Sequence, residues 1–232
     1  MTLSPPYVML MASLPPLGDL FGQHQTPLTE VQLQHRLRYL TAEDRETLSK
    51  MEQLVRRSKQ PAQWTDAQIV GSAKALLGRL RSNTLKQAVE LVLNLRTIIA
   101  ALRRRKLGES SPPKQSDWGY SPWMQRIERH WTEPDFGLGA VVPWLPEARR
   151  LWDNDDSVEL ERLILVESWK QFGRLSNGHY FDFPAVVLYV LRWSLINRRV
   201  NYDREIAEKR FNSLIDEGIG NFDNQLFSSK TT

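Results

Sequence analysis

The sequence predicts an all-α protein with two packed multi-helix units and a long buried core helix in each. Apolar residues recur at helical spacing through residues 29–106, and the steps of three and four are unbroken in residues 83–106. Polar pairs with capping-box spacing precede three of these repeats: Thr29 with Gln32, Thr41 with Asp44, and Thr65 with Gln68. Residues 185–191 are rich in β-formers, but no partner strands are evident, so helix is favoured there too.

The opening apolar run, residues 7–14, lies between two pairs of prolines. Because proline fixes its backbone angle and has no N–H, this run forms either a short N-terminal strand or two helical turns. Three amphipathic helices follow, starting at Thr29, Thr41 and Thr65, and the first is expected to end near Tyr39.

The longest predicted helix covers residues 83–106. At ~1.5 Å per residue it is roughly 36 Å long. Its apolar arc is wider than the seam of a two-stranded coiled coil, so we expect it to be buried among several helices.

Residues 108–120 are rich in Gly, Ser and Pro and lie near the middle of the chain. They predict an N-terminal helical unit (1–108), a linker (109–122), a C-terminal helical unit (123–218) and a frayed tail (219–232).

The C-terminal half starts with a Trp-rich stretch, residues 118–152, to which the periodicity assigns no helix. Helices are predicted at 157–172, after an Asp182 cap, and at 203–215. Sliding the chain by 96 residues aligns the helix at 89–103 with 185–199, which indicates either an internal repeat or the general similarity of two buried helices.

Composition and charge exclude several classes of protein. The 232 residues carry a formal net charge of +4 with acids and bases interspersed, which does not by itself indicate nucleic-acid binding. The absence of cysteine excludes disulfides, thiolate metal sites and a Cys nucleophile. The apolar runs at 7–14 and 183–196 are shorter than the ~18 residues of a membrane span, and the first lacks a basic flank. We therefore expect a cytoplasmic protein without an integral membrane segment.

The residues that usually carry chemistry do not form a recognisable pattern. The glycine motifs that cradle phosphates or build a hydrolase elbow are absent, and the acidic turn at 153–156 lacks the glycine and the final Glu of a calcium loop. Ser176 lies near His179 in sequence, but no acid that would orient the imidazole can be identified. The histidines do not have metal-ligand spacing: His24, His35, His130 and His179. We expect neither an enzyme nor a bound cofactor or metal.

Two groups of residues are candidates for partner binding. The long helix ends in Arg103, Arg104, Arg105 and Lys106, which form either a solvated helix end or a cluster that docks on an acidic stalk or anionic headgroups. Trp118, Tyr120 and Trp123 beside the linker are core anchors or an exposed docking patch. Arg192 lies within an apolar helix and must extend to solvent or pair with a carboxylate.

Three segments carry a resemblance to known proteins. They are Tyr7-Val-Met-Leu-Met-Ala-Ser-Leu-Pro15, Leu40-Thr-Ala-Glu-Asp-Arg45, and Gly178-His-Tyr-Phe-Asp-Phe-Pro184 followed by Tyr189. In these segments the chain resembles an uncharacterised bacterial family encoded within V-type ATPase operons. Its tandem helical units, built around a Leu-Arg core helix, are also similar to the C (or d) subunit of V/A-type rotary ATPases, although this chain has room for only two of that subunit's three helical repeats.

The resemblance implies a non-catalytic adaptor for hydrogen ion transport, lying in the cytoplasm against the inner membrane. Its partners would be the rotor-stalk and proteolipid-ring subunits, with no nucleotide, metal or nucleic acid. The alternative is a free-standing helical interaction protein that binds nucleic acid through basic helix ends. The salt dependence of binding distinguishes the two hypotheses. Binding to phosphates weakens steeply as the salt concentration rises, whereas an apolar assembly interface persists.

Overall fold

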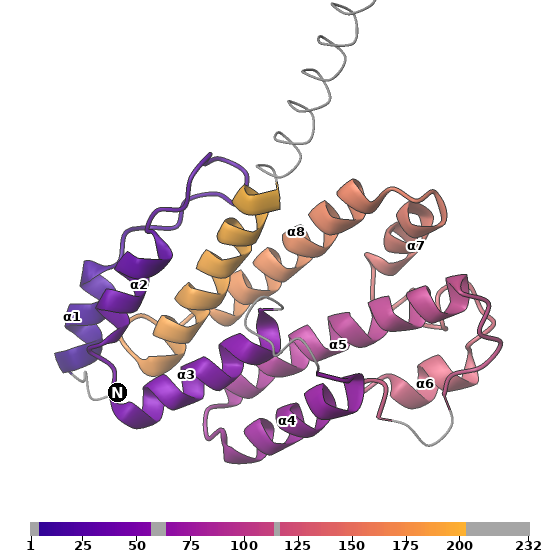
Figure 1. Cartoon of the computed structure of the whole chain (residues 1–232), viewed down its shortest axis with the longest axis horizontal. Coiled ribbons are helices and arrows are strands. Elements are labelled where there is room, and N and C mark those ends of the chain that lie inside the picture. Colours follow the sequence, from indigo (N-terminus) through magenta and orange to yellow (C-terminus); the bar gives the residue numbers. More distant parts are fainter. Residues whose placement is uncertain (1–4, 57–63, 114–116, 203–232) are drawn as a thin grey trace, which may run out of the picture.

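The computed structural model describes residues 5–56, 64–113 and 117–202, and the regular structure in these ranges is helical throughout (Figure 1). The labelled helices are α1 (Pro5–Ser13), α2 (Glu30–Leu37), α3 (Ala42–Val55), α4 (Asp66–Arg79), α5 (Asn83–Lys106), α6 (Met124–Arg129), α7 (Leu145–Asp153) and α8 (Ser157–Leu175). Residues 183–202 form a further helix. The predicted all-α class is confirmed, while the predicted helix at 203–215 and the tail at 219–232 lie outside the described residues.

The predicted helix starts of the first half are confirmed. Thr29 and Thr65 form complete capping boxes, in which each threonine accepts a backbone N–H and a glutamine side chain accepts the N–H of the threonine. Thr41 accepts the N–H of Asp44 at the start of α3. The prolines around the opening run do not prevent a helix, and residues 7–13 belong to α1 rather than to a strand.

The long helix α5 has the predicted bounds and crosses the molecule beside α8 (Figure 1). Its N-terminal half belongs to one apolar cluster and its C-terminal half to another. Helix α8 is also shared, but in the opposite sense: its end belongs to the first cluster and its start to the second. The first cluster is formed by α1 to α4, the start of α5, the end of α8 and the helix at 183–202. The second cluster is formed by the end of α5, α6, α7, the start of α8 and the segments 118–123 and 131–142.

These clusters divide the chain differently from the predicted units at 1–108 and 123–218. The helix at 183–202 packs with the N-terminal helices, where the indole of Trp193 donates a hydrogen bond to the carbonyl of Leu28 at 3.0 Å. Tyr189 likewise donates to the carbonyl of Pro15 at 2.8 Å. Periodicity indicates that a helix is buried, but not against which other helix, so it could not place the boundary between the two cores.

Helices α6 and α7 lie in the Trp-rich stretch to which the sequence pattern assigns no helix. Both are short, and their caps, Trp123 and Trp144, make no side-chain capping hydrogen bond. The side-chain caps that identified the other helices are therefore missing, although α7 has Pro146 in its first turn. Among the described residues, no helix combines the length and apolar composition needed to cross a membrane.

Candidate functional site

The basic end of α5 is attached to the rest of the protein by three of its four cations. Lys106 donates to the carbonyl of Trp152 at 2.7 Å and forms an ion pair with Asp155. Its ammonium also lies 5.6 Å from the centre of the Trp152 ring. Lys106 therefore joins the end of α5 to the turn between α7 and α8.

Arg105 holds a turn of the second cluster. Its guanidinium donates to the carbonyls of Glu133 and Pro134, the latter at 2.8 Å, and lies 4.4 Å from the centre of the Phe136 ring. Burial lowers the pKa of Arg105, and the neighbouring charge of Arg149 lowers it further. Arg105 therefore donates hydrogen bonds to backbone carbonyls that lie in a turn outside the helices.

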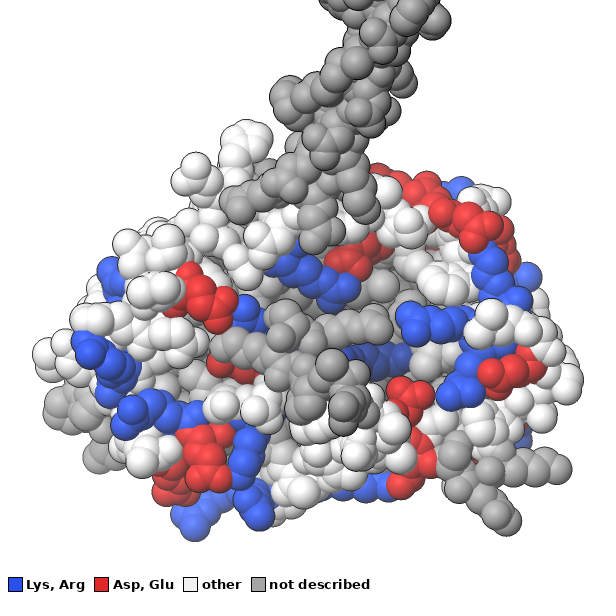
Figure 2. Space-filling model, in the orientation of Figure 1, with Lys and Arg blue, Asp and Glu red and all other residues white. Residues whose placement is uncertain are grey.

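The remaining two cations differ from each other. Arg104 pairs with Glu109 at 3.2 Å and with Asp66 at 3.4 Å. Arg103 is exposed and makes no side-chain hydrogen bond or ion pair with another described residue. Figure 2 shows basic and acidic side chains interspersed over this face of the molecule rather than a broad basic area. Of the predicted basic cluster, Arg103 alone has no such contact within the part of the chain that the structure describes.

The predicted exposed patch of Trp118, Tyr120 and Trp123 is wrong for Trp118, which is only 3% exposed and packs edge-on against Trp131 at 6.0 Å between ring centres. Tyr120 is partly buried against the first cluster and Trp123 against the second. Aromatic residues in a loop rich in Gly and Pro do not reveal whether that loop folds back onto the core.

The segment folds back because α5 offers it a buried hydroxyl. The backbone N–H of Tyr120 donates to Oγ1 of Thr97 at 2.9 Å, and this hydroxyl lies 2.8 Å from the carbonyl of Leu93. Gly119 is needed here, since a Cβ atom would lie 2.7 Å from Cγ2 of Thr97.

A polar cluster at the other end of the molecule was missed by the sequence analysis, which found no acid to orient His179. Nδ1 of His179 lies 2.6 Å from Oδ2 of Asp182, and its Nε2 lies 2.9 Å from the hydroxyl of Thr84. The hydroxyl of Thr84, the imidazole of His179 and the carboxylate of Asp182 are thus linked in the order found in sites that activate a hydroxyl nucleophile. Asp182 also accepts the N–H of Ala185, and Thr84 lies in the first turn of α5, so this chain of bonds connects the starts of two helices.

The same end holds a second polar contact. The hydroxyl of Tyr7 donates to Asp44, which also accepts from Thr41 at 2.8 Å. Burial raises the pKa of Tyr7 well above its ordinary value, and the hydrogen bond to Asp44 and the charge of Asp182 act in the same direction. Asp182 and Asp44 lie in different segments, and Tyr7 from α1 brings these segments together.

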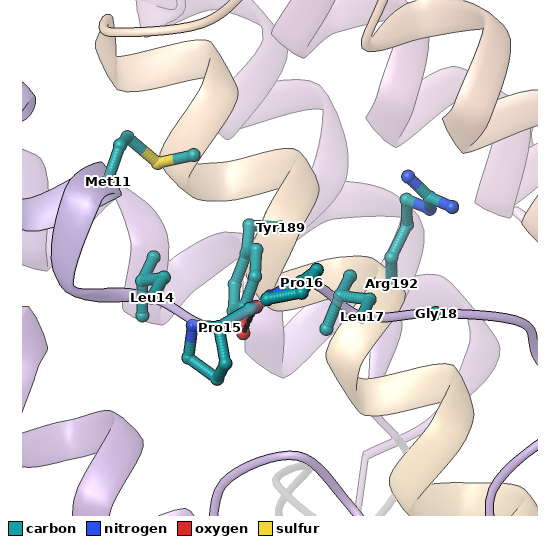
Figure 3. Close-up of a pocket in the computed structure, with 8 residues that line it drawn as sticks. All are labelled: Met11, Leu14, Pro15, Pro16, Leu17, Gly18, Tyr189 and Arg192. Atoms are coloured by element: carbon teal, nitrogen blue, oxygen red, sulfur yellow. Dashed lines mark hydrogen bonds between the residues drawn. The ribbon is translucent and has the colours of Figure 1, made fainter.

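A pocket of 280 Å³ lies where residues 11–18 cross the helix at 183–202 (Figure 3). Arg192 lines it, and its guanidinium lies 4.0 Å from the centre of the Trp169 ring. Burial lowers the pKa of Arg192. The side chain therefore stacks on an aromatic ring, and no ion pair with a described carboxylate accompanies the stacking. Within the described ranges, no three His, Asp or Glu side chains gather as a metal ion would require.

The fold and these contacts define a helical protein whose candidate sites are surfaces and a small pocket. The chain belongs to the family described as "Protein of unknown function (DUF2764)", whose model matches residues 25–218. No curated protein and no solved structure matches it.

Proposed function

We propose that the chain is a non-catalytic adaptor subunit of a bacterial V/A-type rotary ATPase. In this role it would couple the central rotor stalk to the membrane proteolipid ring from the cytoplasmic side, peripheral to the inner membrane. The proposal rests on the resemblance of three segments to a family encoded within V-type ATPase operons.

The observation that carries it is that these three segments, distant in sequence, meet in space. Tyr7 of the first segment hydrogen-bonds to Asp44 of the second, and its ring lies 6.5 Å from that of Phe183 in the third. Tyr189 donates to the carbonyl of Pro15 and closes the group. Residues that form one packed unit are constrained together, which supports treating the three short resemblances as one feature.

The unit also offers a surface for a partner. Met9 is 67% exposed and Tyr180 is 69% exposed, and Phe181 is partly exposed beside Tyr180. These residues belong to the same segments, at the end of the molecule where α1 and the turn after α8 lie (Figure 1). Exposed aromatic and Met side chains are typical of interface anchors. We assign this end to the partner contact.

A rigid connection between two partners also requires a stiff element. Helix α5 is continuous over 24 residues and is buried in both clusters, so a load applied at one end of it is carried by packed side chains to the other. Arg103 lies near the far end of this helix and is the cation available there for an acidic partner.

The test is co-purification of the intact chain with the stalk and ring subunits of a V-type ATPase. The double variant Tyr180→Asp with Phe181→Asp should lose association, because two charges would enter an apolar contact. Val158→Asp is the matched control, since Val158 is exposed at the start of α8, away from this end. Undiminished association by the folded double variant would contradict the assigned surface, and no association by the unaltered chain would contradict the adaptor role itself.

The alternative of nucleic-acid binding through basic helix ends predicts a different result. Arg104, Arg105 and Lys106 are engaged with the protein's own groups, which leaves few cations at this helix end for phosphates. Binding to an oligonucleotide that falls steeply with salt would favour the alternative, whereas association with the subunits that persists in high salt would favour the adaptor.

A further inference from the structure

The pocket beneath residues 11–18 is lined mainly by apolar side chains and carries a cation at one end. Its lining residues are Met11, Leu14, Pro15, Pro16, Leu17, Gly18, Tyr189 and Arg192. Figure 3 shows Met11 and Arg192 at opposite ends, with the ring of Tyr189 between them. A ligand that fits this lining carries one polar group at the Arg192 end and hydrocarbon elsewhere.

Arg192 supplies a charge that the described residues do not neutralise. No carboxylate within the described ranges forms an ion pair with it, and its Nε atom is buried without a hydrogen-bond partner there. Trp169 covers one face of the guanidinium at 4.0 Å. An arginine keeps its charge in such surroundings, and a planar carboxylate fits the edge of the guanidinium through paired hydrogen bonds.

Pro15, Pro16 and Tyr189 offer a ligand no free hydrogen-bond donor. Pro15 and Pro16 have no backbone N–H, and the hydroxyl of Tyr189 already donates to the carbonyl of Pro15. A peptide or a sugar would leave its own polar groups unpaired against these residues, which costs binding free energy. The lining therefore favours a small amphiphile over a partner protein.

The pocket volume indicates a small ligand. At 280 Å³ the pocket is slightly smaller than the roughly 300–1,000 Å³ of sites for drug-sized ligands, so it suits a smaller molecule. We propose that this pocket binds a medium-chain carboxylate of the size of hexanoate or octanoate, with the carboxylate on Arg192 and the chain along Leu14 and Leu17 towards Met11. The site goes beyond the adaptor role and does not depend on it.

The experiment titrates the purified intact chain with butanoate, hexanoate and octanoate, using calorimetry and ligand-observed NMR. Affinity should rise about fourfold for each methylene buried. The neutral analogue 1-octanol should bind at least about tenfold more weakly than octanoate, since it cannot form a charge-assisted pair. Equal binding of the alcohol and the acid would overturn the proposal.

Variants test the role of the cation. Arg192→Gln should weaken octanoate binding at least about tenfold, and Arg192→Lys should keep part of it. Arg174→Gln is the control, because Arg174 is exposed on α8 and its loss changes the net charge equally. Octanoate binding by folded Arg192→Gln as tight as that of the unaltered chain would overturn the proposal.

The variant Met11→Trp tests the same pocket without changing Arg192, in case Arg192→Gln does not fold. This change fills the end of the pocket opposite Arg192, so octanoate should weaken more than butanoate. If the Met11→Trp variant bound every acid as tightly as the unaltered protein does, the assigned position of the ligand's hydrocarbon chain would be contradicted. A protein that binds vesicles containing anionic phospholipid but none of the free acids would show a membrane surface contact instead and would also overturn the proposal.

Discussion

The two apolar clusters reach similar burial by different means. The first is built mainly from aliphatic side chains on capped helices, with Trp193 and Phe172 as its large buried aromatic residues. The second is built around aromatic side chains on short helices and turns, among them Trp118, Trp131 and Phe136. Regular helices satisfy most of their own backbone groups, and in the first cluster Trp193 and Tyr189 donate to the loop carbonyls of Leu28 and Pro15.

The second cluster has more of its chain in turns, and here the donors to backbone carbonyls include the cations at the end of α5. Arg105 and Lys106 donate to carbonyls of the turns, and the indole of Trp131 donates to the carbonyl of Glu109 at 2.8 Å. Phe136 itself has a φ of 52°, in the left-handed region that few non-glycine residues adopt. The cations at the end of α5 are therefore part of the second cluster, in addition to any part they play in docking.

The largest expected effect comes from removing a central aromatic side chain from either cluster. Trp193→Ala in the first and Phe136→Ala in the second should each lower the free energy of unfolding by about 3–5 kcal/mol, because both side chains are fully buried. Denaturant unfolding followed by circular dichroism and by tryptophan fluorescence measures this. Helices α5 and α8 belong to both clusters, so the two signals should coincide in both variants.

Separate unfolding transitions in Phe136→Ala would contradict the expected cooperativity of the two clusters. The second cluster would then unfold while the first kept its helical signal, and the clusters would be independent domains rather than one cooperative unit.

The next effect lies at the junction of the clusters, at Thr97. Thr97→Val keeps the shape but removes the acceptor for the N–H of Tyr120, which should cost about 1–3 kcal/mol. Thr97→Ser keeps the hydroxyl and loses one methyl group, at about 1 kcal/mol. Thermal unfolding measures both, and a valine variant as stable as the serine variant would show that this hydrogen bond does not anchor residues 117–121.

The contrast between the clusters also explains how much could be predicted from the sequence. The capping threonines and the bounds of α5 follow from local patterns, so the all-α class and most helices of the first cluster were predictable. Helices α6 and α7 are short and have no side-chain cap, so this local signal is missing at their starts.

The candidate sites show the same division. The basic run was identified, but its intramolecular partners at 133–134 and 152–155 were not, since nothing local links them to α5. The chain from Thr84 through His179 to Asp182 spans almost 100 residues, and spacing cannot reveal it. For Trp118 the sequence left a core anchor and an exposed patch as alternatives, because loop composition does not show whether the loop packs on the core.

Neighbouring cations at the end of α5 offer a smaller but sharper test. Arg105→Gln should cost about 1 kcal/mol, because the turn at 133–134 loses its donor and the guanidinium is only partly buried. Arg103→Gln should change stability by less than about 0.5 kcal/mol. Chemical denaturation of the two variants, with equal loss of charge, compares them directly. Equal stabilities would mean that Arg105 is no more part of the second cluster than Arg103 is.

The smallest expected effect is a difference between the clusters in how stability depends on alkaline pH. Burial raises the pKa of Tyr189 from 10.0 to about 12, and the pKa of Tyr7 is also raised, whereas the described members of the second cluster include no tyrosine. A raised tyrosine pKa means that the folded state holds the proton more tightly than the unfolded state does. The associated stability is fully present below about pH 10 and is lost as pH rises towards 12.

Tyr189→Phe should therefore cost about 0.5–1 kcal/mol near neutral pH, through loss of the hydrogen bond to Pro15, and should flatten the decline of stability above pH 10. The decline should not vanish, because Tyr7 still titrates in the first cluster. Urea unfolding at a series of alkaline pH values measures the slope, with Phe136→Leu as a second-cluster variant whose slope should equal that of the unaltered chain. If Tyr189→Phe kept the full alkaline slope while Phe136→Leu reduced it, alkaline sensitivity would lie in the second cluster, and the burial of the Tyr189 hydroxyl would not be its cause.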